Sequence, residues 1–243
     1  MDPLTISAAS GMRARMESLD MLANNIANAS TGGYKADREF YSLYTAPEAA
    51  GSQPEADTLP VIERPWTDFS QGELHATGNP LDVALAGFGF FTVNGPSGPL
   101  YTRNGNFRLS DAGVLTTVEG YPVRTSDGVP LTLTSASPVE ISRDGTVGQD
   151  GTMVGQLELV DFANRMSLEK QGHNYFRQTD TSAKLVAPAG TEVQQGQMEI
   201  SNADSAFGAV RLISVMRQFE ALQKAVLLGN QMNRQAVEQV AKV

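Results

Sequence analysis

The sequence predicts an α+β fold that is mainly β. It combines a β-rich, sandwich- or barrel-like outer domain with N- and C-terminal helices that pair into a coiled-coil-like core domain. Apolar residues recur at heptad-like spacing in residues 4–28 and again in residues 207–243. Between these segments, short β-type runs alternate with glycine-containing turns. A lone helix at each end needs a helical partner, so we expect the two to pair with each other or with copies of themselves in neighbouring subunits.

The N-terminal helix is predicted from steps of three and four between its apolar residues, the spacing that brings one helix face against another helix. We expect this helix to stop at Thr31-Gly32-Gly33, where glycine supplies the positive φ of a C-cap. The apolar stripe consists of Ala9, Met12, Met16, Leu19, Ala23 and Ile26.

Three asparagines stand near the end of this helix, at Asn24, Asn25 and Asn28, and they lower its helix propensity. In one interpretation their amides fix the register of helix pairing at some cost in stability. In the other they mark a fraying helix end that leads into the turn at residues 30–33. The spacing alone leaves both interpretations open.

A connector is predicted at residues 46–60, which are rich in proline, glycine and acidic residues. The expected organisation has four parts. These are residues 1–35 for the N-terminal helix, 36–80 for the connector and an extended segment, 81–200 for the β-rich domain and 201–243 for the C-terminal helix.

The β-rich domain is predicted from short strand signals separated by turn dipeptides, the pattern typical of a sandwich or barrel. The predicted strands are Val83–Leu85, Phe88–Val93, Val114–Val118, Leu131–Leu133, Val139–Ile141 and Gln156–Val160. The turn dipeptides are Asn104-Gly105, Asp127-Gly128, Asp144-Gly145 and Asp150-Gly151, which are suited to positive φ.

The C-terminal helix is predicted over residues 207–243, a stretch that contains no proline. It would run about 50 Å at ~1.5 Å per residue. Both helices could simply pack on the β-rich domain, but their narrow, partly polar seams favour contact with several neighbours. Because isolated helices of this kind are marginal in water, we expect the ends to be poorly ordered in the monomer. The seam consists of Leu212, Val215, Phe219, Leu222 and Val226, and it weakens at Gly229, Asn233 and Ala236.

The charge of the chain is unevenly distributed. The net charge is −9, with 0 in residues 1–35, +3 in residues 207–243 and −12 in between. An acidic middle argues against nucleic-acid binding. We also expect no membrane insertion, because no apolar run reaches the ~18 residues of a membrane span. We expect no cleaved signal peptide, because the start of the chain lacks a basic region and an apolar region. The chain has no cysteine, which excludes disulfides and cysteine-based metal sites.

Catalytic and cofactor motifs are incomplete, so we expect neither enzyme activity nor a cofactor or metal. His75 and His173 stand in polar, turn-like stretches without a second ligand at suitable spacing. Gly87-Phe88-Gly89 lacks the third glycine of a dinucleotide fingerprint. Ser167-Leu168-Glu169-Lys170 matches Ser-x-x-Lys without its companion motif, and the turn at Asp144-Gly145 does not meet the EF-hand pattern.

The chain resembles bacterial flagellar rod and hook proteins in several motifs that follow the same order over nearly its whole length. The N-terminal signature is Leu22-Ala23-Asn24-Asn25-Ile26-Ala27-Asn28 with Thr31-Gly32-Gly33-Tyr34-Lys35. Similar stretches follow at residues 71–74, 77–85, 87–93, 101–107, 113–117, 120–123, 144–147, 155–160 and 197–202, and the last is Arg217-Gln218-Phe219-Glu220.

The resemblance implies a structural subunit of the flagellar basal-body rod, which assembles helically into part of a hollow drive shaft that transmits torque. In this family the terminal helices pair in a core domain around the channel. The expected partners are copies of the chain, other flagellar rod and hook proteins, and the flagellar type III export apparatus. The expected location is the periplasmic rod of the basal body, reached without a cleaved signal peptide.

Among family members, the short segment between Lys35 and Gln71 favours the proximal rod protein that carries a β domain. A distal rod or hook-like axial protein is the alternative, and Ala203 after Ser201-Asn202 departs from the family pattern. The predicted assembly interface comprises Met16, Leu19, Asn24, Asn25, Ile26 and Asn28 on one helix and Leu212, Val215, Phe219, Leu222 and Val226 on the other.

A hypothesis from a different class is a homodimeric β-domain protein that binds a carbohydrate or peptide ligand. Its candidate binding platforms would be the aromatic residues Trp66, Tyr101 and Tyr175, which we expect to be exposed.

Overall fold

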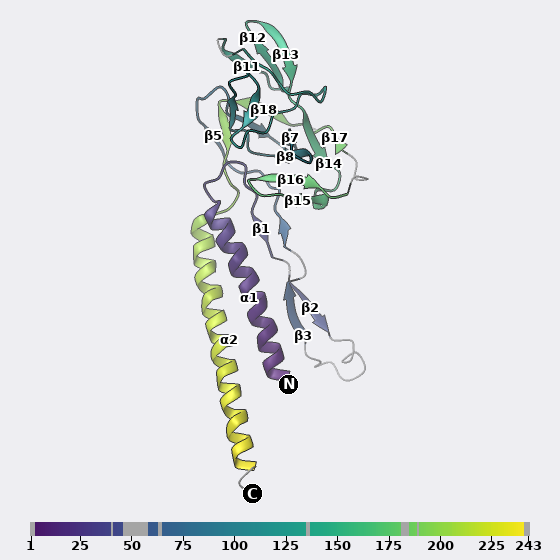
Figure 1. Cartoon of the computed structure of the whole chain (residues 1–243). Helices are drawn as coiled ribbons and strands as arrows, with labels where there is room; N and C mark the ends of the chain where they lie inside the picture. Colours follow the sequence, from purple (N-terminus) through teal and green to yellow (C-terminus); the bar gives the residue numbers. More distant parts are fainter. Residues whose placement is uncertain are drawn as a thin grey trace. The chain divides into compact units, whose positions relative to one another are not determined.

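The computed structural model describes residues 3–39, 41–45, 58–62, 65–134, 137–180, 185–188 and 190–240. The chain forms two compact units, which Figure 1 shows with the sequence in colour. A helical unit contains Met1–Ala27, Asp37–Thr67 and Asp204–Val243. A β unit contains Asn28–Ala36 and Asp68–Ala203. The stretch predicted as a connector and an extended segment, residues 36–80, therefore contributes to both units.

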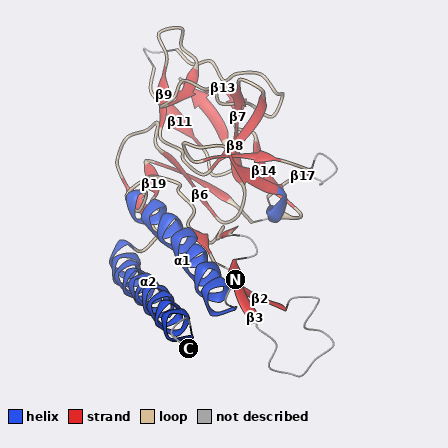
Figure 2. Cartoon of the chain, turned by 60° about the horizontal axis from the view of Figure 1, so that its bottom comes forward, coloured by secondary structure: helices blue, strands red, loops and turns tan. Residues whose placement is uncertain are grey.

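The helical unit is built on α1 (Pro3–Ala27) and α2 (Ser205–Val240), which lie side by side in both Figure 1 and Figure 2. Its strands form two antiparallel pairs, and one of them places β3 against α1. Most of the predicted connector, residues 46–57, lies outside the described residues, and residues 58–60 belong to β3. The pairs are β1 (Asp37–Arg38) with β4 (Trp66–Thr67) and β2 (Tyr41–Thr45) with β3 (Thr58–Ile62).

The helix ends differ from the expected ones for local reasons. The first helix stops at Ala27, before the predicted glycine cap, and a turn follows in which the Thr31 N–H donates to the Asn28 carbonyl. Gly33 has the expected positive φ of 67°, but a Cβ there would lie 2.3 Å from the Asn104 nitrogen, so its role is a close backbone approach.

Asp204 caps α2, because its Oδ1 accepts from the N–H groups of Ala206 and Phe207.

The β unit holds a six-stranded antiparallel sheet, a three-stranded sheet and three two-stranded pairs, which confirms an α+β fold that is mainly β. The six-stranded sheet has the order β15 (Leu168–Lys170), β16 (Tyr175–Gln178), β8 (Gly98–Thr102), β7 (Phe90–Gly95), β14 (Leu159–Phe162) and β17 (Leu185–Val186). The three-stranded sheet has β11 (Val139–Ile141), β12 (Thr146–Gln149) and β13 (Thr152–Gln156). The pairs are β9 (Phe107–Leu109) with β10 (Leu115–Thr117), β6 (Val83–Ala86) with β18 (Glu192–Gln195), and β5 (Leu74–Ala76) with β19 (Gln197–Glu199).

Hydrophobic residues cover the six-stranded sheet on both faces, because successive strand residues point to opposite sides. In β7, Phe91 and Val93 enter a large core with Val83, Leu85 and other aliphatic residues. Phe90 points the other way, into a smaller cluster. That cluster is aromatic, with edge-to-face ring contacts, and contains Phe90, Tyr101, Val160, Phe162 and Phe176.

Two predicted strands are not formed as expected. Residues 131–133 make only isolated bridges, and the run at 156–160 is divided between β13 and β14. Three of the four turn dipeptides contain a glycine with positive φ. At Asn104-Gly105 the glycine serves close packing instead, because a Cβ at Gly105 would lie 1.6 Å from the Val83 carbonyl oxygen.

Gly105→Ala is expected to destabilise the β unit by about 3 kcal/mol, because the Val83 backbone lies in the core and cannot move aside cheaply. The matched control is Gly148→Ala, where the Cβ would meet only the Thr152 oxygen at an ordinary 3.4 Å. Urea unfolding followed by far-ultraviolet circular dichroism measures both. Equal midpoints for the two variants would contradict the close-packing role of Gly105.

Candidate assembly interface

The antiparallel register of the two helices follows from two close contacts. A Cβ at Gly11 would lie 3.4 Å from Leu222 Cδ1, and a Cβ at Gly208 would lie 3.0 Å from Ile26 Cγ1. Because both helices rise equally per residue, this register places Leu22 level with Leu212. The end of α2, residues 232–240, then has no level partner in α1, and Figure 1 shows α2 extending beyond the start of α1.

The face of α2 that turns toward α1 is the predicted seam. Among the α2 residues whose side chains are described, Gly208 and Val215 are buried and the other seam positions are half-buried, while the remainder of the helix is exposed. The predicted residues thus lie on the covered stripe of α2 within a single chain. The half-buried positions are Leu212, Phe219, Leu222, Val226 and Gly229.

The covered arc of α1 differs from the predicted stripe. Ala9, Met16 and Ala23 are exposed, whereas Leu19 and Ile26 are half-buried. The physical reason is that α1 contacts β3 and β1 as well as α2, so the arc that it buries is not the stripe that faces α2 alone. The buried positions are Ala8, Ala14, Ser18 and Leu22, and Ser18 has no exposed surface.

The asparagines have separate roles. Asn25 hydrogen-bonds the backbone of Asp37 twice, because its Nδ2 donates to the Asp37 carbonyl at 2.8 Å and its Oδ1 accepts from the Asp37 N–H at 3.0 Å. Asn28 belongs to the turn after α1, where its Oδ1 accepts from the Thr31 hydroxyl. Asn24 is exposed. A helix residue that fixes the start of β1 was not anticipated from the sequence.

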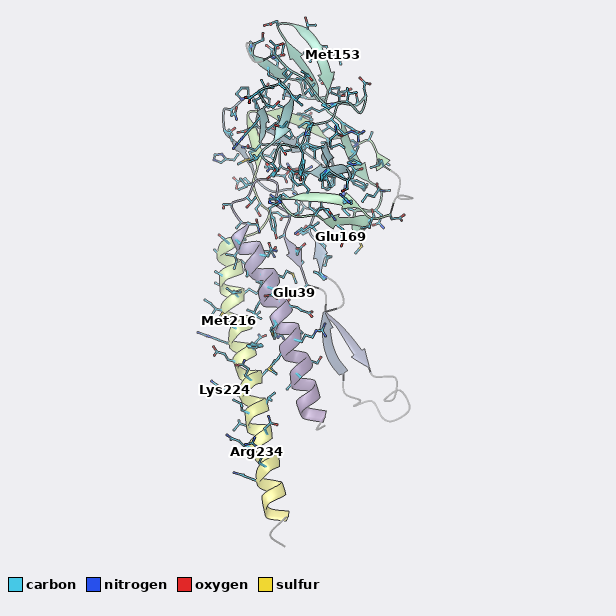
Figure 3. All side chains as sticks on the ribbon, in the orientation of Figure 1. Glu39, Met153, Glu169, Met216, Lys224 and Arg234 are labelled. Carbon is cyan, nitrogen blue, oxygen red and sulfur yellow. The ribbon has the colours of Figure 1, made fainter. Side chains whose placement is uncertain are left out.

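An ion pair between α2 and the segment after β1 was also missed. The guanidinium of Arg211 lies 2.9 Å from the carboxylate of Glu39, and the Glu39 side chain is almost fully buried. Figure 3 labels Glu39 beside the helices. Sequence analysis found no signal for this pair because the two residues stand far apart in the chain.

The outward surface of α2 carries large apolar side chains in two groups. One group lies near its start and the other near its end, and polar residues between them include Arg217 and Lys224. Figure 3 labels Met216, Lys224 and Arg234 along this helix. The exposed apolar residues are Phe207, Val210, Ile213, Met216, Leu227, Leu228 and Met232, with Met16 on α1.

Within the β unit, the segment that follows α1 in sequence is held to the segment that precedes α2. The Gly33 N–H donates to the Glu199 carbonyl at 2.7 Å, and the Ala36 N–H donates to Asn202 Oδ1 at 2.7 Å. The Asn202 side chain also donates to the carbonyl oxygens of Asp68 and Ser70. We call residues 33–36 with residues 199–202 the clasp.

A buried ion cluster lies at the clasp. The Lys35 ammonium donates to Glu199 Oε1 at 2.6 Å, and Arg103 Nε donates to Glu199 Oε2 at 2.8 Å. Only 1% of Lys35, 3% of Arg103 and 0% of Glu199 is exposed. Burial lowers the pKa of Lys35, and the nearby Glu199 carboxylate offsets part of this shift.

The described residues show no arrangement suited to catalysis or metal binding. Both histidines are exposed, and no cluster of potential metal ligands occurs among these residues. Ser167 is buried and its hydroxyl donates to the Asn164 carbonyl. Asp144 accepts from the N–H and hydroxyl of Thr146, bonds that lower the pKa of its carboxyl in an ordinary turn.

The prediction of exposed aromatic platforms for ligand binding is wrong for two of the three residues. Tyr101 and Tyr175 are buried in the two cores, and the Tyr175 hydroxyl is bonded to Thr117 and Glu119. Burial, together with the Glu119 carboxylate, raises the pKa of Tyr175. Trp66 is exposed. No described helix is long and apolar enough to cross a membrane.

Comparison with known families gives two matches along the chain. Residues 7–35, which include most of α1 and the start of the clasp, match the family model described as "Flagella basal body rod protein". Residues 84–149, in the β unit, match the model described as "Flagellar hook protein FlgE/F/G D1 domain".

Similar proteins extend over nearly the whole chain. The flagellar basal-body rod protein FlgF of Caulobacter vibrioides is 33% identical, over 93% of this chain and 92% of its own length. The flagellar basal-body rod protein FlgG of Agrobacterium fabrum is 34% identical, over 93% of this chain and 94% of its own length. FlgG of Buchnera aphidicola subsp. Schizaphis graminum is 33% identical, over 91% of this chain and 94% of its own length.

The helix register can be tested by a disulfide in this cysteine-free chain. The variant Ile26→Cys with Gly208→Cys is expected to form an intramolecular bond readily, because Ile26 Cγ1 approaches the Gly208 Cβ position to 3.0 Å. Mobility on a non-reducing gel reports the bond. The mismatched control is Ile26→Cys with Val215→Cys, two helix turns away, which should stay reduced. Equal bonding in both variants would contradict the register.

Proposed function

The chain belongs to the family of flagellar basal-body rod proteins, and we propose that it joins the rod through its two terminal helices. As its relatives indicate, it is a structural subunit of the rod. The single observation that carries the proposal is the outward surface of α2, which leaves large apolar side chains exposed along a helix whose other face is already covered by α1.

Exposed apolar surface of this kind favours contact with other protein chains. Val210 is 70% exposed and Leu228 is 60% exposed, and they stand five helix turns apart on the same face of α2. Met16 adds an apolar side chain, 54% exposed, on α1. Neighbouring subunits would cover these residues, while the seam from Leu212 to Val226 holds the helix pair together inside each chain.

The proposal divides the predicted interface residues into two groups. Met16 is exposed and would be covered by a neighbouring subunit, and Asn24 is exposed on the same helix. Leu19, Ile26 and the α2 seam support the surface from within, and Asn25 and Asn28 fix the chain at the end of α1.

Contacts between different surfaces of successive subunits do not close on themselves, and they build a helical tube. We propose that copies of this chain and other rod and hook proteins meet in this way to form part of a hollow shaft that transmits torque in the periplasm. Delivery through the flagellar export apparatus, without a cleaved signal peptide, belongs to the same proposal. The role is structural and includes no catalysis.

The relatives also bear on which rod protein this chain most resembles. The alignment with FlgF of Caulobacter vibrioides extends over 231 residues, whereas that with FlgG of Agrobacterium fabrum extends over 250 residues for the same 93% of this chain. The FlgG alignment therefore needs more gaps in this chain. We propose a FlgF-like layout, in line with the short segment between Lys35 and Gln71, and we keep the proximal position in the rod as part of this proposal.

Val210→Asp and Leu228→Asp are expected to abolish motility while leaving the isolated protein folded. Each places a charge where a neighbour would bury an apolar side chain, but neither changes the interior of a single chain. Swimming in soft agar, in a bacterium whose own copy is deleted, measures the function. Circular dichroism checks the fold.

The matched control is Met153→Asp, which changes an equally exposed apolar residue on β13 of the β unit, labelled in Figure 3. It should support normal swimming. Motile Val210→Asp and Leu228→Asp strains would rule out this surface of α2 as an assembly contact.

Hydrogen–deuterium exchange on the isolated protein is expected to be faster in α1 and α2 than in strands β6, β7 and β8. The helices gain their stability from neighbours that are absent in the monomer, whereas these strands carry the core. Equal protection of helices and strands at low concentration would show that the helices are already stable without assembly.

A further inference from the structure

The ion cluster at the clasp contains one anion and two cations, all withdrawn from water. Glu199 accepts from Lys35 and Arg103 with its two carboxylate oxygens, and Oε1 also accepts from the Gly72 N–H at 2.8 Å. The cations also donate to the backbone carbonyls of Ser70, Gly89 and Leu85. Glu199 is the carboxylate that accepts from both cations, and Asp68 acts electrostatically on Lys35.

Glu199 is the last member of the cluster in the sequence. It stands 164 residues after Lys35, 127 residues after Gly72 and 96 residues after Arg103. Every other member lies within the first 103 residues of the chain. An N-terminal part of the chain therefore contains both cations, their carbonyl partners and Asp68, which acts electrostatically on Lys35, but it lacks Glu199, which accepts from both cations.

Two cations do not enter a dry interior without a counter-charge, because the loss of hydration outweighs their bonds to carbonyl groups. The partners of Arg103 are the carbonyls of Leu85 and Gly89, at the end of β6 and just before β7. Leu85 belongs to the large core, and Phe90 and Phe91 follow Gly89 in β7. A hydrated Arg103 would keep water at the place where these strands meet.

We propose that the docking of Glu199 is the step that completes the folding of the β unit. Strands β6, β7 and β8 become protected from solvent only when the segment that carries Glu199 has docked, since its carboxylate allows the two cations to be buried. The β unit then folds in a single step, when the segment that carries Glu199 docks. It does not fold progressively from its N-terminal strands. This inference concerns the β unit alone and does not rest on the proposed rod function.

The order of protection tests the proposal directly in the unmodified full-length chain. The protein is refolded by dilution from urea, and hydrogen exchange is pulse-labelled at successive times. Amides of β6, β7 and β8 are expected to gain protection in the same kinetic phase as those of β5 and β19. Protection of β6–β8 in an earlier phase than β19 would overturn the proposal.

Substitutions separate the role of charge from that of packing. Glu199→Gln keeps the shape of the side chain and removes its charge, and it is expected to slow refolding at least tenfold. Adding Lys35→Met to Glu199→Gln removes one of the two uncompensated cations. The double variant should therefore refold faster than Glu199→Gln alone. A double variant that refolds more slowly would overturn the proposal, because it would show that these side chains contribute only through packing and hydrogen bonds.

The control is Glu192→Gln, which removes the carboxylate of an exposed, 3.9 Å pair with Arg143 in the same unit. Its refolding rate should stay within about twofold of that of the unmodified chain. Refolding of Glu199→Gln at the rate of this control would also overturn the proposal. If Glu199→Gln does not fold at all, the order of protection in the unmodified chain still decides the question.

Discussion

The bonding of residues 33–36 to residues 199–202 is the constraint on which the β unit depends, because it joins the two ends of that unit. It joins two segments separated by most of the sequence, one directly downstream of α1 and the other directly upstream of α2. The same two parts of the chain meet again in the helical unit, where Ile26 packs on Gly208. The Lys35–Glu199 and Arg103–Glu199 pairs make this connection specific, because a buried carboxylate tolerates no substitute partner without charge.

The features that follow from local sequence patterns could be predicted from the sequence. The covered stripe of α2 coincides with the heptad positions from Leu212 to Val226, because α1 is the main neighbour of this helix among the described residues. The β-rich class followed from turn chemistry and strand spacing. The motifs also indicated the flagellar rod family, which the relatives show.

The features that the sequence did not reveal arise from contacts between distant residues. The arc buried by α1 depends on β3 as well as α2, so a single heptad stripe could not predict it. Lys35, Arg103 and Glu199 are charged residues that one expects in solvent, and only the fold shows that they share a dry site. Gly105 has the sequence context of a turn glycine, yet its use is a close backbone contact with Val83. The aromatic residues Tyr101 and Tyr175 belong to cores that only the strand register defines.

The unequal lengths of α1 and α2 have a mechanical consequence. Each subunit ends in a single-helix step, residues 232–240, beside a two-helix body. Two bodies with such a step have room to overlap along their sides. An overlapping contact resists twisting by shear, and it spreads the load over its whole length.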